Sequence, residues 1–509
     1  MVFVNRASHR PSPTSVDVLS AVPSVHYSFW MNTPPHSRFD TITEREKGLH
    51  RNLSARQLSM IAIGGAIGTG LFLGSGFAIG FAGPAVLVSY LIGAVITLLL
   101  MGCLAEMTVA HPTSGSFGAW AEFYLSPLAG FLVRFAYWAG VVFALGTEIT
   151  AITVYMRFWF PSVQGWLWIL GFTLLLVLVN AFNVKFFGAV EYAFSALKIS
   201  AIVAFLALGT WIVVSASHQA PSDPAAPISF ANYTAFGGFF PKGIWGMWVA
   251  VLVSLFSYFS IEMIAVAAGE AKDPQRAITK AFRATMFRLA LFYLLTLALI
   301  LAIVPWNVMA SGATQSPFVT VMMRTHIAGA AGVVNFVILI AALSAMNSQL
   351  YITTRMLFSL SRAGFAPRRL GSVTRNGVPI AALLVSTAGI GLAAILNVRY
   401  HDRSFLLMLA ISMFGPMFAW LMIFVTHLRF RHRHAGAKLA FRMWGYPYTS
   451  LLGAALMSAA LITTLFTREF RPTLLYGIPF LLLLTVTYAV RRTRALSVTQ
   501  QAFEETQPL

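Results

Sequence analysis

The sequence predicts an all-α membrane protein with about 12 transmembrane helices, and three observations support this fold class. The chain of 509 residues is 58% hydrophobic and only 10% charged. A soluble domain, in contrast, carries about 25% charged residues. Apolar runs long enough to cross a bilayer, which takes about 20 residues, recur along most of the chain. Because lipid cannot satisfy free backbone polar groups, these runs are predicted to be helices.

Twelve apolar runs follow one another along the chain. They cover about residues 58–80, 84–109, 128–157, 163–183, 190–216, 243–268, 284–306, 328–361, 378–398, 404–428, 449–467 and 472–490. We therefore expect a core of ten spans over 58–428, a loop with two further spans over 429–490, and a cytoplasmic tail over 491–509. The polar segment 1–57 has no apolar core of a signal peptide and is expected to be cytoplasmic and largely disordered. Within it, residues 1–30 resemble an upstream extension, because Met31 opens a more ordinary N-terminus.

The positions of the basic residues predict the orientation of the chain. If the N-terminus is cytoplasmic and the spans alternate, only seven of the 35 Lys and Arg residues lie in external loops. These are Arg157, Lys242, Arg324, Arg399, Arg403, Arg468 and Arg471. This positive-inside bias favours an even number of spans with both termini in the cytoplasm. It also argues against nucleic-acid binding despite the net charge of +19, because no basic face forms on a soluble domain.

One segment between spans is too polar to cross the membrane. Residues 110–127 carry several aromatic side chains and fall on the expected cytoplasmic side. An interfacial helix or a re-entrant hairpin is predicted there.

Five acidic residues lie in or at the ends of the apolar runs. An ionisable group within a membrane is costly and is therefore a candidate for a functional site. Glu106, Glu191 and Glu270 lie near internal ends of spans, where a structural cap or loop anchor is expected. Glu148 and Glu262 lie deeper, and each either lines a pathway or pairs structurally with a neighbouring helix.

Two of the spans carry further polar groups at positions that suggest a site. Tyr137, Val141, Ala144 and Glu148 fall on one face of the third span, which is expected to look inward. Lys198 stands about two turns into the fifth span. It either extends to the cytoplasmic surface or acts as an internal cation that neutralises a site or carries a proton.

Two spans are predicted to be interrupted helices. The first contains GAIGTG, and glycine disfavours helix by about 1 kcal/mol per residue relative to alanine. Gly64 and Gly68 could simply allow close helix packing, or the stretch could unwind and expose amides that hold a carboxylate. The sixth span has Ser257, Ser260 and Glu262 in its middle. Interruptions at corresponding positions predict an inverted repeat of residues 58–216 and 243–428.

At these segments the sequence resembles the amino acid–polyamine–organocation (APC) superfamily, specifically its bacterial amino-acid permeases. The motifs are LSARQLSMIAIGGAIGTGLFLGSG, MGCLAEMTVAHPTSGSF, FGAVEYAFSALKISAI, FSYFSIEMIAVAAGEAKDPQRAITKA and LSAMNSQLYITTRMLFSLSRAGFAPRRL. They stand in the family's order and cover about residues 45–430. The resemblance implies the LeuT fold, a 5+5 inverted repeat plus two C-terminal helices, with substrate between the first and sixth spans.

The resemblance also implies roles for individual residues. The substrate carboxylate would meet the Thr69 hydroxyl and the Gly70 amide, and the α-amino group would meet carbonyls near Ala66, Phe256 and Phe259. The full set expected to bind substrate is Ala66, Gly68, Thr69, Gly70, Tyr137, Phe256, Ser257, Phe259 and Glu262.

Proton coupling and specificity are assigned in the same way. Glu262 matches a gating or proton-linked glutamate, and Lys198 matches a lysine that replaces a sodium ion in some members. Glu148 resembles acidic residues of some arginine and ornithine permeases, as well as of permeases for other amino acids. Two positions depart from the pattern. Ser260 stands where glycine is common, and Val141 stands where lysine permeases have a bulky aromatic residue.

The expected function is import of amino acids across the inner (cytoplasmic) membrane by proton symport with alternating access. An exchanger of the same fold and a nutrient sensor with little transport are the alternatives. No enzymatic activity is expected, because there is no HExxH pair, no paired catalytic aspartates in adjoining spans and no nucleotide-binding loop. No metal or cofactor is expected, and the proton gradient supplies the driving force. The sequence leaves the particular amino acid and the oligomeric state open.

Overall fold

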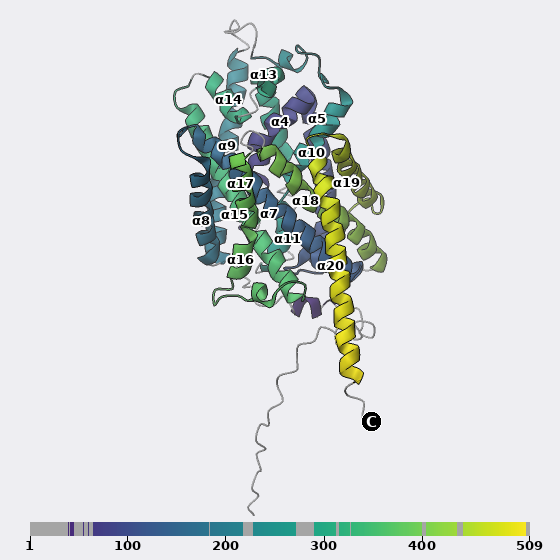
Figure 1. Cartoon of the computed structure of the whole chain (residues 1–509). Coiled ribbons are helices and arrows are strands. Elements are labelled where there is room, and N and C mark those ends of the chain that lie inside the picture. Colours follow the sequence, from purple (N-terminus) through teal and green to yellow (C-terminus); the bar gives the residue numbers. More distant parts are fainter. Residues whose placement is uncertain are drawn as a thin grey trace, which may run out of the picture.

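The computed structural model describes residues 39, 41–44, 54, 57, 60, 65–182, 184–216, 228–270, 290–311, 315–325, 327–399, 404–434 and 441–504. Within these ranges every regular element is helical and no strand occurs. Figure 1 shows long, roughly aligned helices that form one bundle. Most of the N-terminal segment 1–57 lies outside the described residues, and so do residues 271–289, which include Lys272, Arg276, Lys280 and Arg283.

The helices have the following bounds. The first half of the chain contains η1 (Gly70–Gly74), α4 (Ser75–Ala82), η2 (Gly83–Ala85), α5 (Val86–Ala110), α6 (Ser116–Tyr124), α7 (Pro127–Arg157), α8 (Gly165–Phe182), α9 (Val184–Ala216) and η3 (Phe230–Tyr233). The second half contains α10 (Gly243–Tyr258), α11 (Met263–Ala267), η4 (Ala268–Glu270), an unlabelled helix Ala290–Ile303, α13 (Trp306–Ser311), α14 (Pro317–Arg324), α15 (Ala330–Arg362), η5 (Arg368–Gly371), α16 (Ile380–Ser386), α17 (Ala388–Arg399), α18 (Ser404–Arg433), α19 (Tyr448–Phe466) and α20 (Arg471–Glu504).

The described part of the chain contains ten helical stretches that are long and apolar enough to cross a membrane. The first of them, Gly70–Ala110, holds the end of the first predicted run and all of the second, which the short η2 turn separates. The predicted run 284–306 appears as the shorter apolar helix Ala290–Ile303. The all-α membrane class is therefore confirmed, whereas the number of twelve spans stays a prediction.

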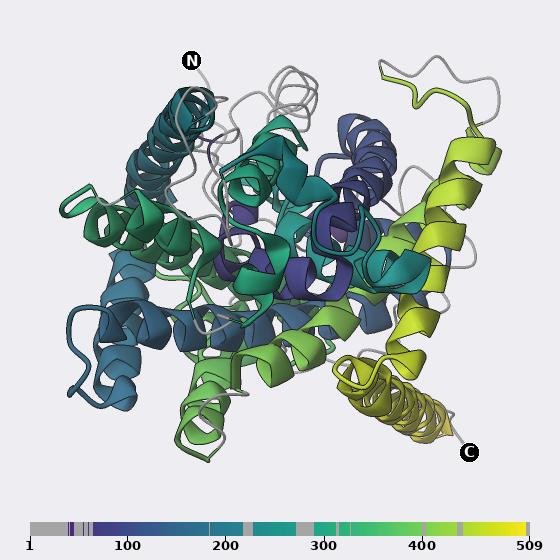
Figure 2. The same cartoon turned by 90° about the horizontal axis from the view of Figure 1, so that it is seen from above.

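Helix α7 lies at the centre of the bundle. It contacts α15, α17 and α18, and in the view from above it crosses the middle of the molecule (Figure 2). Helix α10 packs instead against α4 and α5. The most hydrophobic part of Gly243–Ala267 is completely buried, although it has the composition of a membrane span. An apolar helix enclosed by protein is positioned to line an internal site rather than to face lipid.

The outer helices present apolar side chains to the surroundings. On α8, Leu170 and Leu174 are 62% and 59% exposed. On α20, Leu482 and Leu483 are exposed to a similar extent. Such leucine-rich outer faces suit a lipid environment, where exposed apolar surface carries no penalty. Segment 110–127 differs, because α6 is buried against α7 and α18. The helix in this segment therefore packs within the protein, and the interfacial and re-entrant alternatives both stay predictions.

Candidate functional site

The first predicted break is present in the described residues. Helical geometry is interrupted by bends at Ile67 and Gly68, and the chain then continues as the π-helical turn η1. Two glycines are needed here for close approach. A Cβ at Gly70 would lie 2.7 Å from Ser257 Cα, and one at Gly68 would lie 2.8 Å from Ala345 Cβ. The glycine-rich sequence therefore both weakens the helix and lets the sixth and eighth predicted spans touch the break.

The second predicted break is also present, and it forms without glycine. Helix α10 ends at Tyr258, Phe259 is extended with ψ 158°, and α11 begins at Met263. Between them Ser260 adopts a left-handed conformation with φ 74°. This conformation is unfavourable for residues other than glycine. The substitution of the family's common glycine by Ser260 has therefore not removed the break, but it has left backbone strain there.

A narrow pocket lies between the two breaks. Its lining residues come from the broken segments and from α7, α15 and α18: Gly65, Ala66, Gly68, Gly70, Val141, Ala144, Glu148, Phe256, Phe259, Ser260, Gln349 and Pro416. The cavity volume is about 10 Å³, which is room for roughly one water molecule. An amino acid can therefore enter only if the walls of the pocket separate.

Glu148 connects the third predicted span to the first break. Its Oε2 accepts a hydrogen bond from the Thr69 backbone N–H at 3.3 Å, and the residue is 3% exposed. The Thr69 hydroxyl has no hydrogen-bond partner within the described part of the chain, although it is completely buried. The break thus offers one amide that already holds a carboxylate, and beside that carboxylate one hydroxyl without a hydrogen bond of good geometry that could turn to a ligand.

Glu262 pairs with Tyr137 beside the second break. Tyr137 Oη donates to Glu262 Oε1 at 2.6 Å, and the Ser260 N–H donates to the same oxygen at 3.3 Å. Trp420 lies close enough to Glu262 to interact with its carboxyl group, although neither Glu262 Oε2 nor Trp420 Nε1 makes a hydrogen bond of good geometry among the described residues. Neither Tyr137 nor Glu262 is among the residues that line the pocket, but they adjoin its lining at Ser260.

Lys198 lies in the interior and does not extend to the surface. Its side chain is completely buried, and Nζ donates to Ile67 O at 3.1 Å, directly at the first break. Lys198 also lies within electrostatic range of Glu148 and Glu191. The snorkelling alternative is therefore wrong, and the internal-cation alternative is the one that the geometry supports.

Ser257 contributes to the break mainly through its backbone. Its hydroxyl pairs with Tyr90 Oη at 3.0 Å and donates to Val253 O at 3.2 Å, so it is already used within the fold. Its carbonyl lies 2.8 Å from Tyr293 Oη, and Ala66 O lies 2.7 Å from the same oxygen. Tyr293 shares its single hydroxyl hydrogen between two carbonyls and so joins both breaks.

Three residues near the site were not predicted from the sequence. Tyr293, Gln349 and Trp420 stand in the seventh, eighth and tenth predicted spans. Each is a polar side chain in an apolar run, which is a signal for function or pairing. The cluster Asn347–Gln349 was the clearest of these signals, because three polar residues follow one another at mid-span.

The other acidic residues in the spans have structural partners. Glu191 accepts hydrogen bonds from Ser344 Oγ at 2.5 Å and Asn347 Nδ2 at 3.0 Å, which ties α9 to α15. Glu270 accepts from Tyr351 Oη at 2.6 Å and from Arg355 Nε at 2.9 Å. These contacts agree with the expected anchoring roles.

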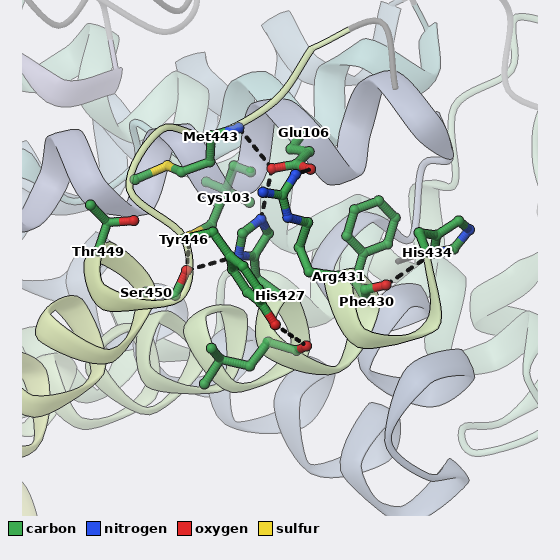
Figure 3. A network of polar contacts seen from close by, with 12 residues as sticks. Cys103, Glu106, His427, Phe430, Arg431, His434, Met443, Tyr446, Thr449 and Ser450 are labelled. Carbon is green, nitrogen blue, oxygen red and sulfur yellow. Dashed lines mark hydrogen bonds and ion pairs between the residues drawn. The ribbon is translucent and has the colours of Figure 1, made fainter. Parts of the chain in front are cut away.

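Glu106 forms the most connected of these anchors (Figure 3). Its carboxylate lies between His427 Nε2 at 3.0 Å, Arg431 Nη1 at 2.7 Å and the Met443 N–H at 2.8 Å. His427 Nδ1 pairs in turn with Ser450 Oγ at 2.9 Å. This network joins α5, α18 and the start of α19, and it lies apart from the residues that line the pocket.

Two interrupted helices that enclose a small pocket inside an apolar bundle are typical of a membrane transporter. Comparison with known proteins identifies its family. The sequence model described as "Amino acid permease" matches residues 57–497. The chain therefore belongs to the amino acid permease family, and the resemblance to permeases of the APC superfamily is confirmed. It is a multi-pass membrane protein that transports amino acids, and it is not an enzyme.

Individual relatives agree with this assignment. The uncharacterized amino acid permease YtnA of Bacillus subtilis (strain 168) is 36% identical over 449 residues, which cover 87% of this chain and 96% of the relative. The gamma-aminobutyric acid permease of the same organism is 34% identical over 459 residues, with 90% and 96% covered. Its amino-acid permease RocE is 35% identical over 461 residues, with 88% and 97% covered.

Proposed function

We propose that this permease imports amino acids across the cytoplasmic membrane by proton symport, with substrate bound between the two broken helices. The observation that carries the proposal is the bond from Lys198 Nζ to Ile67 O at 3.1 Å. A buried ammonium group fixed to the break would respond to substrate binding and to loss of its proton. Lys198 therefore places a protonatable side chain in direct contact with the proposed substrate site.

The substrate would bind along the residues predicted from the sequence. Its carboxylate would accept hydrogen bonds from the Thr69 hydroxyl, which lacks another partner in the described part of the chain, and from the Gly70 amide. Its α-amino group would donate to the break carbonyls near Ala66, Phe256 and Phe259. Backbone groups freed at a helix break suit this role, because they need no side chain to reach the ligand.

Alternating access would follow from movement between two groups of helices. Helix α10 packs against α4 and α5, whereas α7 packs against α15 and α17. Rocking of the first group, together with the Ala290–Ile303 helix, against the second and α8 would open the pocket to one side at a time. The narrow pocket would correspond to a closed stage of this cycle.

The driving force would be the proton gradient, and the termini would be cytoplasmic. Moving one charge across the membrane is worth about 2.3 kcal/mol per 100 mV. Lys198 and Glu262 are the candidates to carry the proton, and Glu148 is the candidate to sense the substrate's charge. The cytoplasmic orientation follows from the excess of Lys and Arg in the predicted internal segments.

The test is uptake of labelled amino acids into proteoliposomes, with and without an inward proton gradient. The panel includes γ-aminobutyrate, because one similar protein is named as its permease. Stimulation by the gradient for one group of substrates is expected. Uptake that ignores the gradient and rises with preloaded amino acid would instead identify an exchanger. Binding without uptake would identify a sensor.

A further inference from the structure

Gln349 presents an unused hydrogen-bonding atom within the wall of the pocket. The residue stands on α15, one turn after Ala345, whose Cβ faces Gly68 at the first break. Gln349 lines the pocket and is 4% exposed. Its Oε1 has no hydrogen-bond partner among the residues that the structure describes. A buried polar atom without a partner is rare in folded proteins and calls for an explanation.

The neighbouring Glu148 explains why this particular atom is left over. The Gln349 side chain lies beside the Glu148 carboxylate. A carboxamide turns its NH₂ group toward a carboxylate, since two acceptors facing each other would repel. The carbonyl oxygen then points away from Glu148. Exchanging the nitrogen and oxygen would not remove the problem, because it would bring the oxygen against Glu148.

The chemistry of the pocket wall restricts what can satisfy this oxygen. Apart from Gln349, Glu148 and Ser260, the lining consists of glycines and apolar side chains, among them Val141, Ala144 and Pro416. No Lys, Arg or His is among the lining residues of the described chain. The described side chains of the wall thus present acceptors but no cation to a ligand. An aliphatic group would leave Oε1 unsatisfied, and a side-chain carboxylate would set a second acceptor against it.

We propose that Gln349 is a specificity-determining residue whose Oε1 accepts a hydrogen bond from an N–H group on the substrate's side chain. The preferred substrates are then amino acids with an amide, imidazole, guanidinium or ammonium side chain, ahead of aliphatic and acidic ones of similar size. The proposal rests on the proposed function, because it assumes that the pocket between the breaks holds the substrate. In this proposal Gln349 recognises the substrate's side chain, whereas the backbone groups at the breaks bind the α-amino and carboxylate groups that all amino acids share.

The test compares glutamine with methionine, which are similar in length but differ in their side-chain N–H groups. Both are used as unlabelled competitors of labelled uptake in proteoliposomes. The variant is Gln349→Met, and the matched control is Ser348→Ala, a neighbouring buried residue that does not line the pocket. Wild type and control are expected to favour glutamine. Gln349→Met is expected to lower the glutamine-to-methionine preference by about tenfold or more, the effect of one lost hydrogen bond to a buried acceptor.

A second measurement keeps the result interpretable if the variant transports poorly. Purified Gln349→Met in detergent should retain a cooperative thermal transition, and methionine should stabilise it more than glutamine does. An unchanged preference would overturn the proposal, and so would an equal loss for both competitors, because Gln349 would then read the shared α-amino group or serve the fold. If wild type imports no amino acid at all, the proposed function fails before the role of Gln349 is reached.

Discussion

The Lys198 ammonium group donates to the carbonyl oxygen of Ile67 at 3.1 Å, and both groups are buried. This contact fixes the fifth predicted span to the interruption of the first. The carbonyl belongs to one of the two bent residues between the helical segments, where a regular helix would have used it internally. The Lys198 ammonium group thus satisfies a carbonyl that the break leaves free. Movement of the break, or loss of the Lys198 proton, would therefore affect the other partner of this bond.

Replacing Lys198 by methionine should uncouple transport from the proton gradient. The Lys198→Met variant keeps the length of the side chain but loses both the charge and the bond to Ile67 O. We expect gradient-driven uptake to fall at least tenfold, while exchange of preloaded amino acid persists. The control is Lys242→Met on an exposed loop. Equal loss of both activities would show that Lys198 serves the fold alone.

Thr69→Ala should weaken substrate binding without affecting folding. The buried hydroxyl lies beside Glu148 but makes no hydrogen bond of good geometry within the described chain, so its removal should disturb the fold little. A lost hydrogen bond to a charged carboxylate is worth about 1.5–3 kcal/mol, so the KM for uptake should rise by at least about tenfold. Thr97→Ala, which removes an intrahelical bond in α5, is the control. Normal uptake by Thr69→Ala would refute the assigned carboxylate site.

Ser260→Gly should stabilise the protein. Glycine reaches the left-handed conformation at φ 74° without the penalty of about 1–2 kcal/mol that other residues carry. The variant should therefore unfold at a higher temperature in detergent, and Ser260→Val should unfold at a lower one. As a comparison, Ser254→Gly in the helical part of α10 should be destabilising. Lower stability of Ser260→Gly would mean that its hydroxyl matters more than the strain.

Glu106→Ala should be strongly destabilising. It leaves Arg431 and the Met443 N–H without a shared acceptor and breaks the network that joins α5 to α18 (Figure 3). Removing one partner of a buried ion pair costs about 3–5 kcal/mol. Glu469→Ala, at an exposed position, should change stability by less than about 0.5 kcal/mol. Thermal unfolding of the two variants side by side measures the difference, and equal stability would contradict the structural role.

The sequence predicted the fold class and the positions of both breaks because these depend on local composition. Dense glycines and a polar group in an apolar run are visible within one segment. The partners of Glu148 and Lys198 were not predictable, since they lie on helices far apart in the chain. Tyr293 was missed for the same reason. Its role depends on two carbonyls from other segments, which no local pattern reveals.

Ser260 shows how tertiary structure can override a local preference. Serine disfavours the left-handed conformation, yet the left-handed turn forms where Gly65 leaves room for it. A Cβ at Gly65 would lie 3.3 Å from the Ser260 side chain, so packing between the two breaks depends on both positions. Gln349 is the reverse case. Its polarity was visible in the sequence, but its missing partner became visible only with the pocket.

The most direct test of proton symport follows protons during amino-acid uptake. Wild-type protein and Lys198→Met are reconstituted into liposomes that contain a pH-sensitive dye, with no proton gradient at the start. Addition of a transported amino acid outside should acidify the interior of the wild-type vesicles, and should not acidify those of the variant. Uptake by the wild type without any acidification would contradict proton symport through the broken-helix site.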